Sequence, residues 1–166
     1  MTDRVKGRTL VTRDEGDAAG DVVIKLYGEE TGGAVSIIEQ PFGPGLLLPP
    51  HVHDNDVWLY VLEGEMHARV GDDVVRATPG CWVLKPRRVP HTMWNAGADP
   101  ARIIEVYTPG GFELFFGDFD ERLRQGPMAL DDLNRVGAPH GIRFFDDWTA
   151  ELKAAHGLRV VGEPDE

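Results

Sequence analysis

The sequence is poor in cysteine and has no long apolar run. Cys81 is the only cysteine among 166 residues, so no disulfide can form within the chain and nothing requires an oxidising compartment. No apolar stretch approaches the ~20 residues needed to cross a bilayer, and the polar N-terminal segment lacks the apolar stretch of a secretory signal. We therefore expect a soluble, cytoplasmic protein in which Cys81 is a small buried hydrophobe.

Basic residues are also scarce. The chain has 17 Lys and Arg against 28 Asp and Glu, a formal net charge of −11. A nucleic-acid-binding protein needs a basic surface for phosphate contacts, and an anionic membrane surface attracts basic segments. The charge balance therefore disfavours both partners and leaves a small molecule as the expected ligand.

Short strands separated by turns are plentiful. The chain contains 20 glycines and 12 prolines, and they punctuate strand-like runs at intervals typical of a β-barrel or sandwich. Residues 1–20 are expected to form an arm with a short strand at 8–11, and residues 21–110 a barrel without helices. The expected strands of the barrel cover residues 22–27, 34–39, 57–62, 66–70, 73–77, 82–85, 92–95 and 102–107.

The apolar period changes to that of a helix after residue 111. Five apolar residues then follow one another with helical spacing and form an apolar stripe, which predicts a helix that ends near Gly126. These residues are Phe112, Phe115, Phe116, Phe119 and Leu123. Further short helices are expected at 131–136 and 148–156. Residues 111–160 are thus predicted to be a helical extension packed on the barrel, with the stripe serving as core or interface packing or, alternatively, as a lid over a substrate.

Two histidines alternate with a valine directly after two prolines. In an extended strand, His51 and His53 point to the same side, and two imidazoles at this spacing can bind one divalent cation. An HxH pair alone is weak evidence of a metal site, because it often occurs by chance.

The order of motifs around this pair is more specific. A strand and turn, Tyr60-Val61-Leu62-Glu63-Gly64-Glu65, follow the pair, and Pro79-Gly80, Pro86 and Pro90-His91 precede Asn95. This series resembles the two motifs of the cupin superfamily, and the chain resembles a small cupin-2 protein similar to quercetin dioxygenase-like cupins. The resemblance implies an all-β, double-stranded β-helix (jelly-roll) barrel, to which the helical periodicity of the C-terminal segment adds two or three short helices. It also implies a homodimer and a divalent metal ion (Fe, Ni, Mn, Cu or Zn) held by His51, His53 and His91.

One position departs from the family pattern. Many cupins supply a glutamate ligand seven residues before the glycine of the Leu-Glu-Gly turn, and here that residue is Val57. Asn55 and Asp56, which lie in the preceding turn, are the candidates for a replacement oxygen ligand.

The alternation of side chains between the two faces of a strand predicts which residues line the pocket. Val57 and Leu59 face inward together, Met93 and Asn95 share the face of His91, and Trp58 and Tyr60 point outward. This mostly apolar surround suits a small, largely apolar or aromatic ligand.

Three functions remain open on the sequence. The first is a dioxygenase-like enzyme that acts on an enol, diketone or aromatic substrate. The second is a non-redox cyclase, isomerase or lyase in which the metal polarises a carbonyl group. The third is a small-molecule-binding protein with a structural metal.

Overall fold

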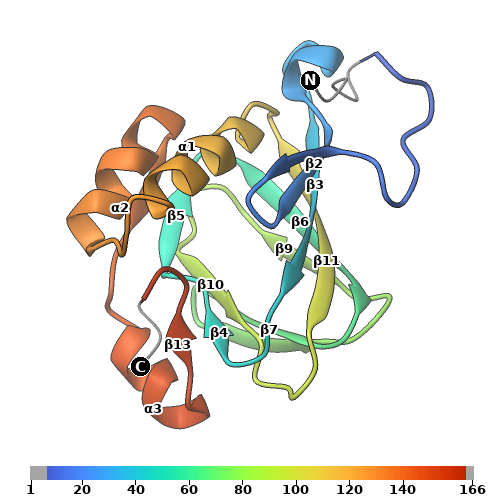
Figure 1. The fold of residues 1–166 in the computed structure, drawn as a ribbon. Helices are drawn as coiled ribbons and strands as arrows, with labels where there is room; N and C mark the ends of the chain where they lie inside the picture. The colour runs from blue at the N-terminus through green and yellow to red at the C-terminus, as the bar shows by residue number, and fades with distance from the viewer. Residues whose placement is uncertain (1–6, 164–166) are drawn as a thin grey trace.

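The computed structural model describes residues 7–163 and shows two facing antiparallel sheets that form a barrel (Figure 1). One sheet has the strand order β1-β2-β3-β11-β6-β9. Its strands are β1 (Asp17–Ala19), β2 (Val22–Leu26), β3 (Ser36–Phe42), β11 (Ala101–Thr108), β6 (Asp56–Glu63) and β9 (Trp82–Lys85).

The second sheet carries the histidines and has the order β12-β5-β10-β4-β13, with β7 pairing both β10 and β8. Its strands are β12 (Ile142–Phe144), β5 (His51–His53), β10 (His91–Trp94), β4 (Leu46–Leu47), β13 (Arg159–Val160), β7 (Met66–Val70) and β8 (Asp73–Ala77). The two sheets together form the double-stranded β-helix that the sequence predicts.

Tight turns fix the strand register. Gly64 ends β6 with a φ of +74°, and a Cβ atom there would lie 2.7 Å from the Cα atom of Ala101. Only glycine fits this left-handed, close-packed position. Along β6, Val57, Leu59 and Val61 are buried and Trp58 is 43% exposed, which confirms the inward and outward faces expected from parity.

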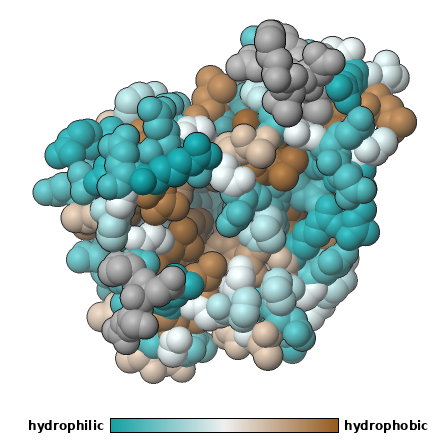
Figure 2. All heavy atoms as spheres, in the orientation of Figure 1, coloured by the Kyte–Doolittle hydropathy of each residue, from teal (hydrophilic) through white to brown (hydrophobic). Residues whose placement is uncertain are grey.

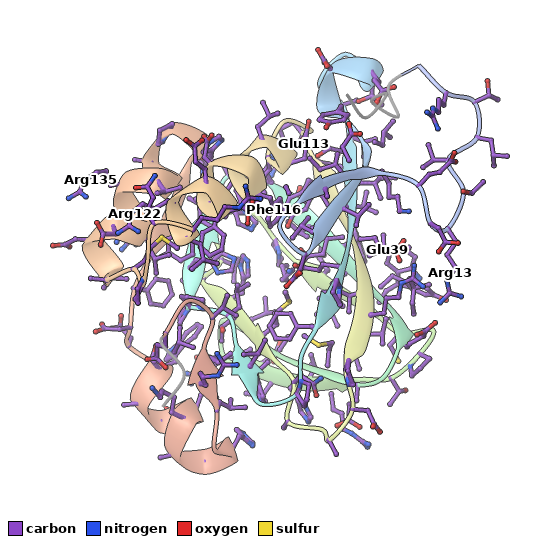
Figure 3. The ribbon with its side chains drawn as sticks, in the orientation of Figure 1. Arg13, Glu39, Glu113, Phe116, Arg122 and Arg135 are labelled. Atoms are coloured by element: carbon purple, nitrogen blue, oxygen red, sulfur yellow. The ribbon has the colours of Figure 1, made fainter. Side chains whose placement is uncertain are left out.

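Within residues 7–163, three α-helices follow the barrel: α1 (Glu113–Leu123), α2 (Leu130–Gly137) and α3 (Thr149–His156), with a 3-10 turn at Ala138–His140 directly after α2. In Figure 1, α1 and α2 lie together across one side of the barrel, and α3 lies near the C-terminus. Asp132 of α2 joins the first two helices through its ion pair with Arg122 of α1 at 3.1 Å. Arg135, which pairs with the same carboxylate at 2.9 Å, lies on α2 itself; Figure 3 labels both arginines. None of the helices within residues 7–163 is long and apolar enough to span a membrane.

A buried glutamate fastens the start of α1 to the N-terminal strands. The Glu113 carboxylate accepts hydrogen bonds from the backbone N–H of Gly28 at 2.8 Å and of Gly111 at 2.7 Å. The aromatic stripe of α1 then packs against the barrel in one cluster with Tyr107 and Phe144. The predicted C-terminal helices are therefore present.

The C-terminal extension also contributes strands, which the sequence analysis did not predict. β12 pairs with β5, placing Phe144 beside His51 and Ile142 beside His53. β13 runs parallel to β4. The extension is thus part of the histidine-bearing sheet as well as a helical cover.

Three local predictions are wrong. Residues 8–11 form no strand, and the first strand is β1 instead. A 3-10 turn at Gly28–Thr31 interrupts the region expected to lack helices. Cys81 is exposed, because it lies in the Pro79-Gly80 turn before an edge strand, where hydrogen bonding to Thr78 lowers the pKa of its thiol.

Candidate metal centre and cavity

The three predicted histidines meet inside the barrel. β5 directs His51 and His53 to the same side, and His91, the first residue of β10, is the antiparallel pairing partner of His51. The ring centroids lie 4.3 Å apart for His51 and His91, 4.7 Å for His53 and His91, and 5.4 Å for His51 and His53. Within residues 7–163, they form the one group of His, Cys, Asp or Glu residues whose ligand atoms all lie within 4.8 Å of one another.

Hydrogen bonds to backbone carbonyls fix the tautomer of each ring. The Nδ1 atoms of His51, His53 and His91 lie 2.8, 3.0 and 2.8 Å from the carbonyl oxygens of Pro49, Asn55 and Val89. A carbonyl only accepts, so each Nδ1 carries the proton and each Nε2 keeps a lone pair. Metal-binding histidines are oriented in the same way by a partner on the other ring nitrogen.

The surroundings keep all three rings neutral near pH 7. Burial lowers the pKa of His53 to about 4, and burial, reinforced by the neighbouring histidines, lowers the pKa of His51 and of His91 well below 6.5. The Nε2 atom of His91 is buried and has no hydrogen-bond partner among the described residues. A buried polar atom without a partner is costly, and a divalent cation bound by three neutral imidazoles would satisfy it. The three residues therefore fit a metal ion.

The loop before His91 is tied to the turn after His53. The backbone N–H of Arg88 donates to the carbonyl of His53 at 2.8 Å, and the Arg88 guanidinium pairs with Asp54 at 2.8 Å. Arg87 donates to the Asp56 carboxylate from its backbone N–H at 2.8 Å and from its guanidinium at 2.6 Å. These contacts hold the two histidine-bearing segments in register.

These contacts also account for the two candidate oxygen ligands. Asp56 does not belong to the histidine group, because its carboxylate is occupied by Arg87. The Asn55 side chain donates to the carbonyl of Pro109 at 2.6 Å, and its backbone carbonyl accepts from His53. Val57 is fully buried in the core, so it places an apolar side chain where many cupins have a glutamate.

A cavity of about 260 Å³ adjoins the histidines, and His51 is one of its lining residues. Its wall is largely apolar and aromatic, and Figure 2 shows apolar side chains gathered around a hollow beside α1. Phe116, labelled in Figure 3, comes from the side of α1 that faces the barrel. The aromatic lining residues are Phe42, Tyr107, Phe112, Phe115, Phe116, Phe119 and Phe144.

The residues predicted to line the pocket lie outside this cavity. Val57, Leu59, Met93 and Asn95 are all buried, but the lining residues of this cavity do not include them. Leu59 and Met93 pack in the core between the sheets. The Asn95 side chain holds the following turn, donating to the carbonyl of Asp99 at 2.9 Å and accepting from the N–H of Gly97 at 2.9 Å.

Sequence reasoning missed a buried polar network in the cavity wall. Lys85 forms an ion pair with Glu105, whose other oxygen accepts a hydrogen bond from the Tyr107 hydroxyl at 2.7 Å and a longer one from Gln40 at 3.4 Å. All four residues line the cavity. Burial and the negative charge of Glu105 raise the pKa of Tyr107 well above 10, so its hydroxyl remains a donor.

Comparisons with known proteins were made by family profile and by structure. The profile of the cupin domain family matches residues 39–107. Among solved structures, TT1209 from Thermus thermophilus is 32% identical over 46% of this chain and 74% of its own, with a TM-score of 0.44. A conserved protein with a double-stranded β-helix domain from Klebsiella pneumoniae is 20% identical over 57% of this chain and 83% of its own, with a TM-score of 0.48.

An enzyme is also among the similar structures. Salicylate 1,2-dioxygenase from Pseudaminobacter salicylatoxidans is 27% identical over 46% of this chain but only 22% of the enzyme, with a TM-score of 0.44. The comparison with curated proteins gave no match. The profile match spans the region from β3 to β11, which contains His51, His53 and His91, and this region of the chain is therefore a cupin domain.

Proposed function

We propose that this cupin is a metal-dependent, dioxygenase-like enzyme that acts on a small enol, diketone or aromatic substrate. The observation that carries the proposal is the convergence of three neutral imidazoles, each oriented by a carbonyl, beside an aromatic cavity. A divalent ion held by His51, His53 and His91 would supply Lewis-acid character and, for a redox metal, the means to use O₂.

The chain's own residues support substrate binding next to that ion. His51 opens into the cavity, so a ligand in the cavity lies beside the histidine group. The phenylalanines of α1 and β12 form an apolar wall that favours a flat apolar body and excludes water. An open cavity next to His51 also favours a catalytic metal over a purely structural one, because structural sites are closed by their four ligands.

The lack of a carboxylate in the histidine group constrains the substrate. Glu105 is buried in the cavity wall, but both of its oxygens are engaged by Lys85, Tyr107 and Gln40. Because both oxygens already accept hydrogen bonds from these neighbours, the carboxylate is directed into the network and not towards a substrate. The site therefore suits a substrate that arrives already ionised or readily enolised.

A non-redox lyase or isomerase is the second candidate. The specific observation in its favour is the same network, which places an ammonium and a phenol hydroxyl in the cavity with His51. Such groups can hold a polarised carbonyl or a developing enolate without O₂. Activity under argon separates this candidate from the first.

Metal content and oxygen dependence test the proposal together. Protein purified anaerobically is assayed for Fe, Ni, Mn, Cu and Zn and reconstituted with each, next to His51→Ala/His53→Ala and a control, His156→Ala, which removes an exposed histidine from α3. We expect near-stoichiometric metal in the wild type and the control, and none in the double variant. Uptake of O₂ with 2,4-pentanedione or a related enol supports the dioxygenase, and turnover under argon supports the second candidate. Failure of all five metals to bind would overturn the proposal.

A further inference from the structure

A buried lysine lies in the wall of the cavity that His51 enters. The Lys85 side chain is 2% exposed and lines the cavity together with Glu105. Its ammonium pairs with one oxygen of Glu105, and its next polar neighbour is the Met93 sulfur at 4.0 Å. An ammonium has three donors, and a thioether is a weak acceptor, so Lys85 has donor capacity that no strong acceptor among the described residues uses.

The strand that carries Lys85 departs in part from the usual pattern of apolar-in and polar-out, because a lysine shares the inward face with Val83, which packs against the core. In β9, Trp82 is 55% and Leu84 38% exposed, while Lys85 is buried. Pairing with β6 sets this register, because Leu84 lies opposite Trp58 and Trp82 opposite Tyr60 on the outer face. Exposing a tryptophan while burying a lysine opposes the hydrophobic effect, and departures of this kind concentrate at functional sites.

The charges around the cavity distinguish Lys85 further. The other charged residues that line the cavity are acidic: Glu105 inside, and Asp21 and Asp120 beside the β1–β2 turn and α1. Lys85 is the one lysine or arginine among the described residues that line the cavity, so it is the ammonium or guanidinium group that an anionic ligand would contact there.

The remaining contacts of the network hold Lys85 in place. The hydrogen bond from Tyr107 and the longer one from Gln40 fix the Glu105 carboxylate, and that carboxylate fixes the ammonium. A charged donor that is already ordered binds a ligand with less loss of side-chain entropy than a mobile surface lysine. The apolar residues that line the same cavity would strengthen a charge-assisted hydrogen bond by excluding water.

We propose that Lys85 binds an oxyanion of the substrate. The Lys85 ammonium donates to a carboxylate or enolate oxygen, and the aromatic or branched apolar body of the same ligand lies against Phe115, Phe116 and Phe144. The site thus takes small monoanionic aromatic acids or enolates rather than neutral aromatics. This inference deepens the proposed function and rests on the same cavity, although it requires no bound metal.

A matched pair of probes tests the assignment. Binding of 4-fluorophenylacetate and of the neutral amide 4-fluorophenylacetamide is measured by ¹⁹F NMR and calorimetry, in chelator so that no metal competes for the carboxylate. The decisive variant is Lys85→Met/Glu105→Gln, which removes both charges and leaves no buried charge unpaired. Lys25→Met is the control, because Lys25 is a half-buried lysine paired with Glu39 and is not among the cavity-lining residues.

We expect the wild type and Lys25→Met to prefer the acid over the amide. The double variant should lose this preference by about tenfold to a hundredfold, the effect of one charge-assisted hydrogen bond. Equal binding of acid and amide by the wild type, or an unchanged preference in the folded double variant, would overturn the assignment. Metal content measured on the same samples separates the two proposals. If the protein prefers the acid over the amide through Lys85 but binds no metal, this inference is supported and the proposed metal-dependent function is contradicted.

Discussion

Acid should destabilise the metal-free protein through its buried histidines. Burial lowers the pKa of His53 from 6.5 to about 4, because the charged ring loses its hydration. Between these two values the unfolded chain binds a proton that the folded protein does not. The stabilisation is therefore fully present above pH 6.5 and is lost as the pH falls towards 4.

The size of the effect follows from the shift. Each pKa unit corresponds to about 1.36 kcal/mol, so His53 alone contributes roughly 3 kcal/mol, of which about 2 kcal/mol is lost by pH 5. His51 and His91 act in the same direction, since burial also lowers the pKa of each. Carboxylates titrate mainly below this window, so histidines dominate the loss between about pH 6.5 and 5.

Urea unfolding followed by circular dichroism, in chelator and at several pH values from about 7.5 to 5, measures this loss. His53→Gln is the matched variant, because the glutamine amide can still donate to the carbonyl of Asn55. We expect its free energy of unfolding to depend less steeply on pH than that of the wild type, by up to one proton, or about 1.36 kcal/mol per pH unit. Parallel pH dependences for the two proteins would refute the argument that His53 is buried and neutral.

Three further outcomes are expected. Reconstitution with a metal that binds, at a concentration about a hundredfold above its Kd, should stabilise the wild type by about 2.7 kcal/mol. This stabilisation should be measured as a rise in Tm that a chelator reverses, and His51→Ala/His53→Ala should show no such rise. Phe116→Ala should weaken binding of 4-fluorophenylacetamide about fivefold through loss of an aromatic contact, whereas Leu114→Ala, on the exposed side of α1, should not change it in the same calorimetric titration. Cys81 should react with a thiol reagent in the native protein at the rate of an accessible thiol, and a need for denaturant would contradict its exposure.

The histidine group was predictable in two steps. The alternation of His51 and His53 along one strand places their rings on the same side, whereas His91 was assigned through the resemblance of the later turns to the second cupin motif, and the structure brings all three together. Their hydrogen-bond partners could not be foreseen, since those partners are backbone carbonyls whose direction depends on the loop geometry. The occupation of Asp56 by Arg87 was hidden for a related reason, because the two residues lie 31 positions apart in the chain.

The cavity could not be predicted because its wall comes from segments far apart in sequence. The alternation of side chains along the strands near the histidines predicted that Val57, Leu59 and Met93 line the pocket, but these residues pack in the core. The cavity is lined instead by His51 together with residues of β12 and α1. The pairing of β12 with β5 joins residues about 90 positions apart, a separation that no local pattern indicates.

The polar network escaped detection because neither β9 nor β11, which supply Lys85, Glu105 and Tyr107, shows a clean alternation. β11 lies between β3 and β6, and its sequence places apolar residues on both faces, Ile103 and Tyr107 on one and Ile104 and Val106 on the other. Periodicity alone therefore leaves the direction of Glu105 undecided. In β9 the pattern is misleading, because the polar Lys85 is the residue that turns inward.

The site divides between two parts of the chain, and this division bears on how its specificity is set. The barrel motifs supply the histidines and the Lys85–Glu105 pair, whereas much of the aromatic wall comes from the extension through α1 and β12. The Nδ1 atoms of the three histidines bond to carbonyls within the barrel motifs themselves, so metal binding does not rely on the phenylalanines. Substitutions in the aromatic stripe should therefore alter which apolar body is accepted and leave metal content unchanged, while substitutions at Lys85 should alter the response to ligand charge.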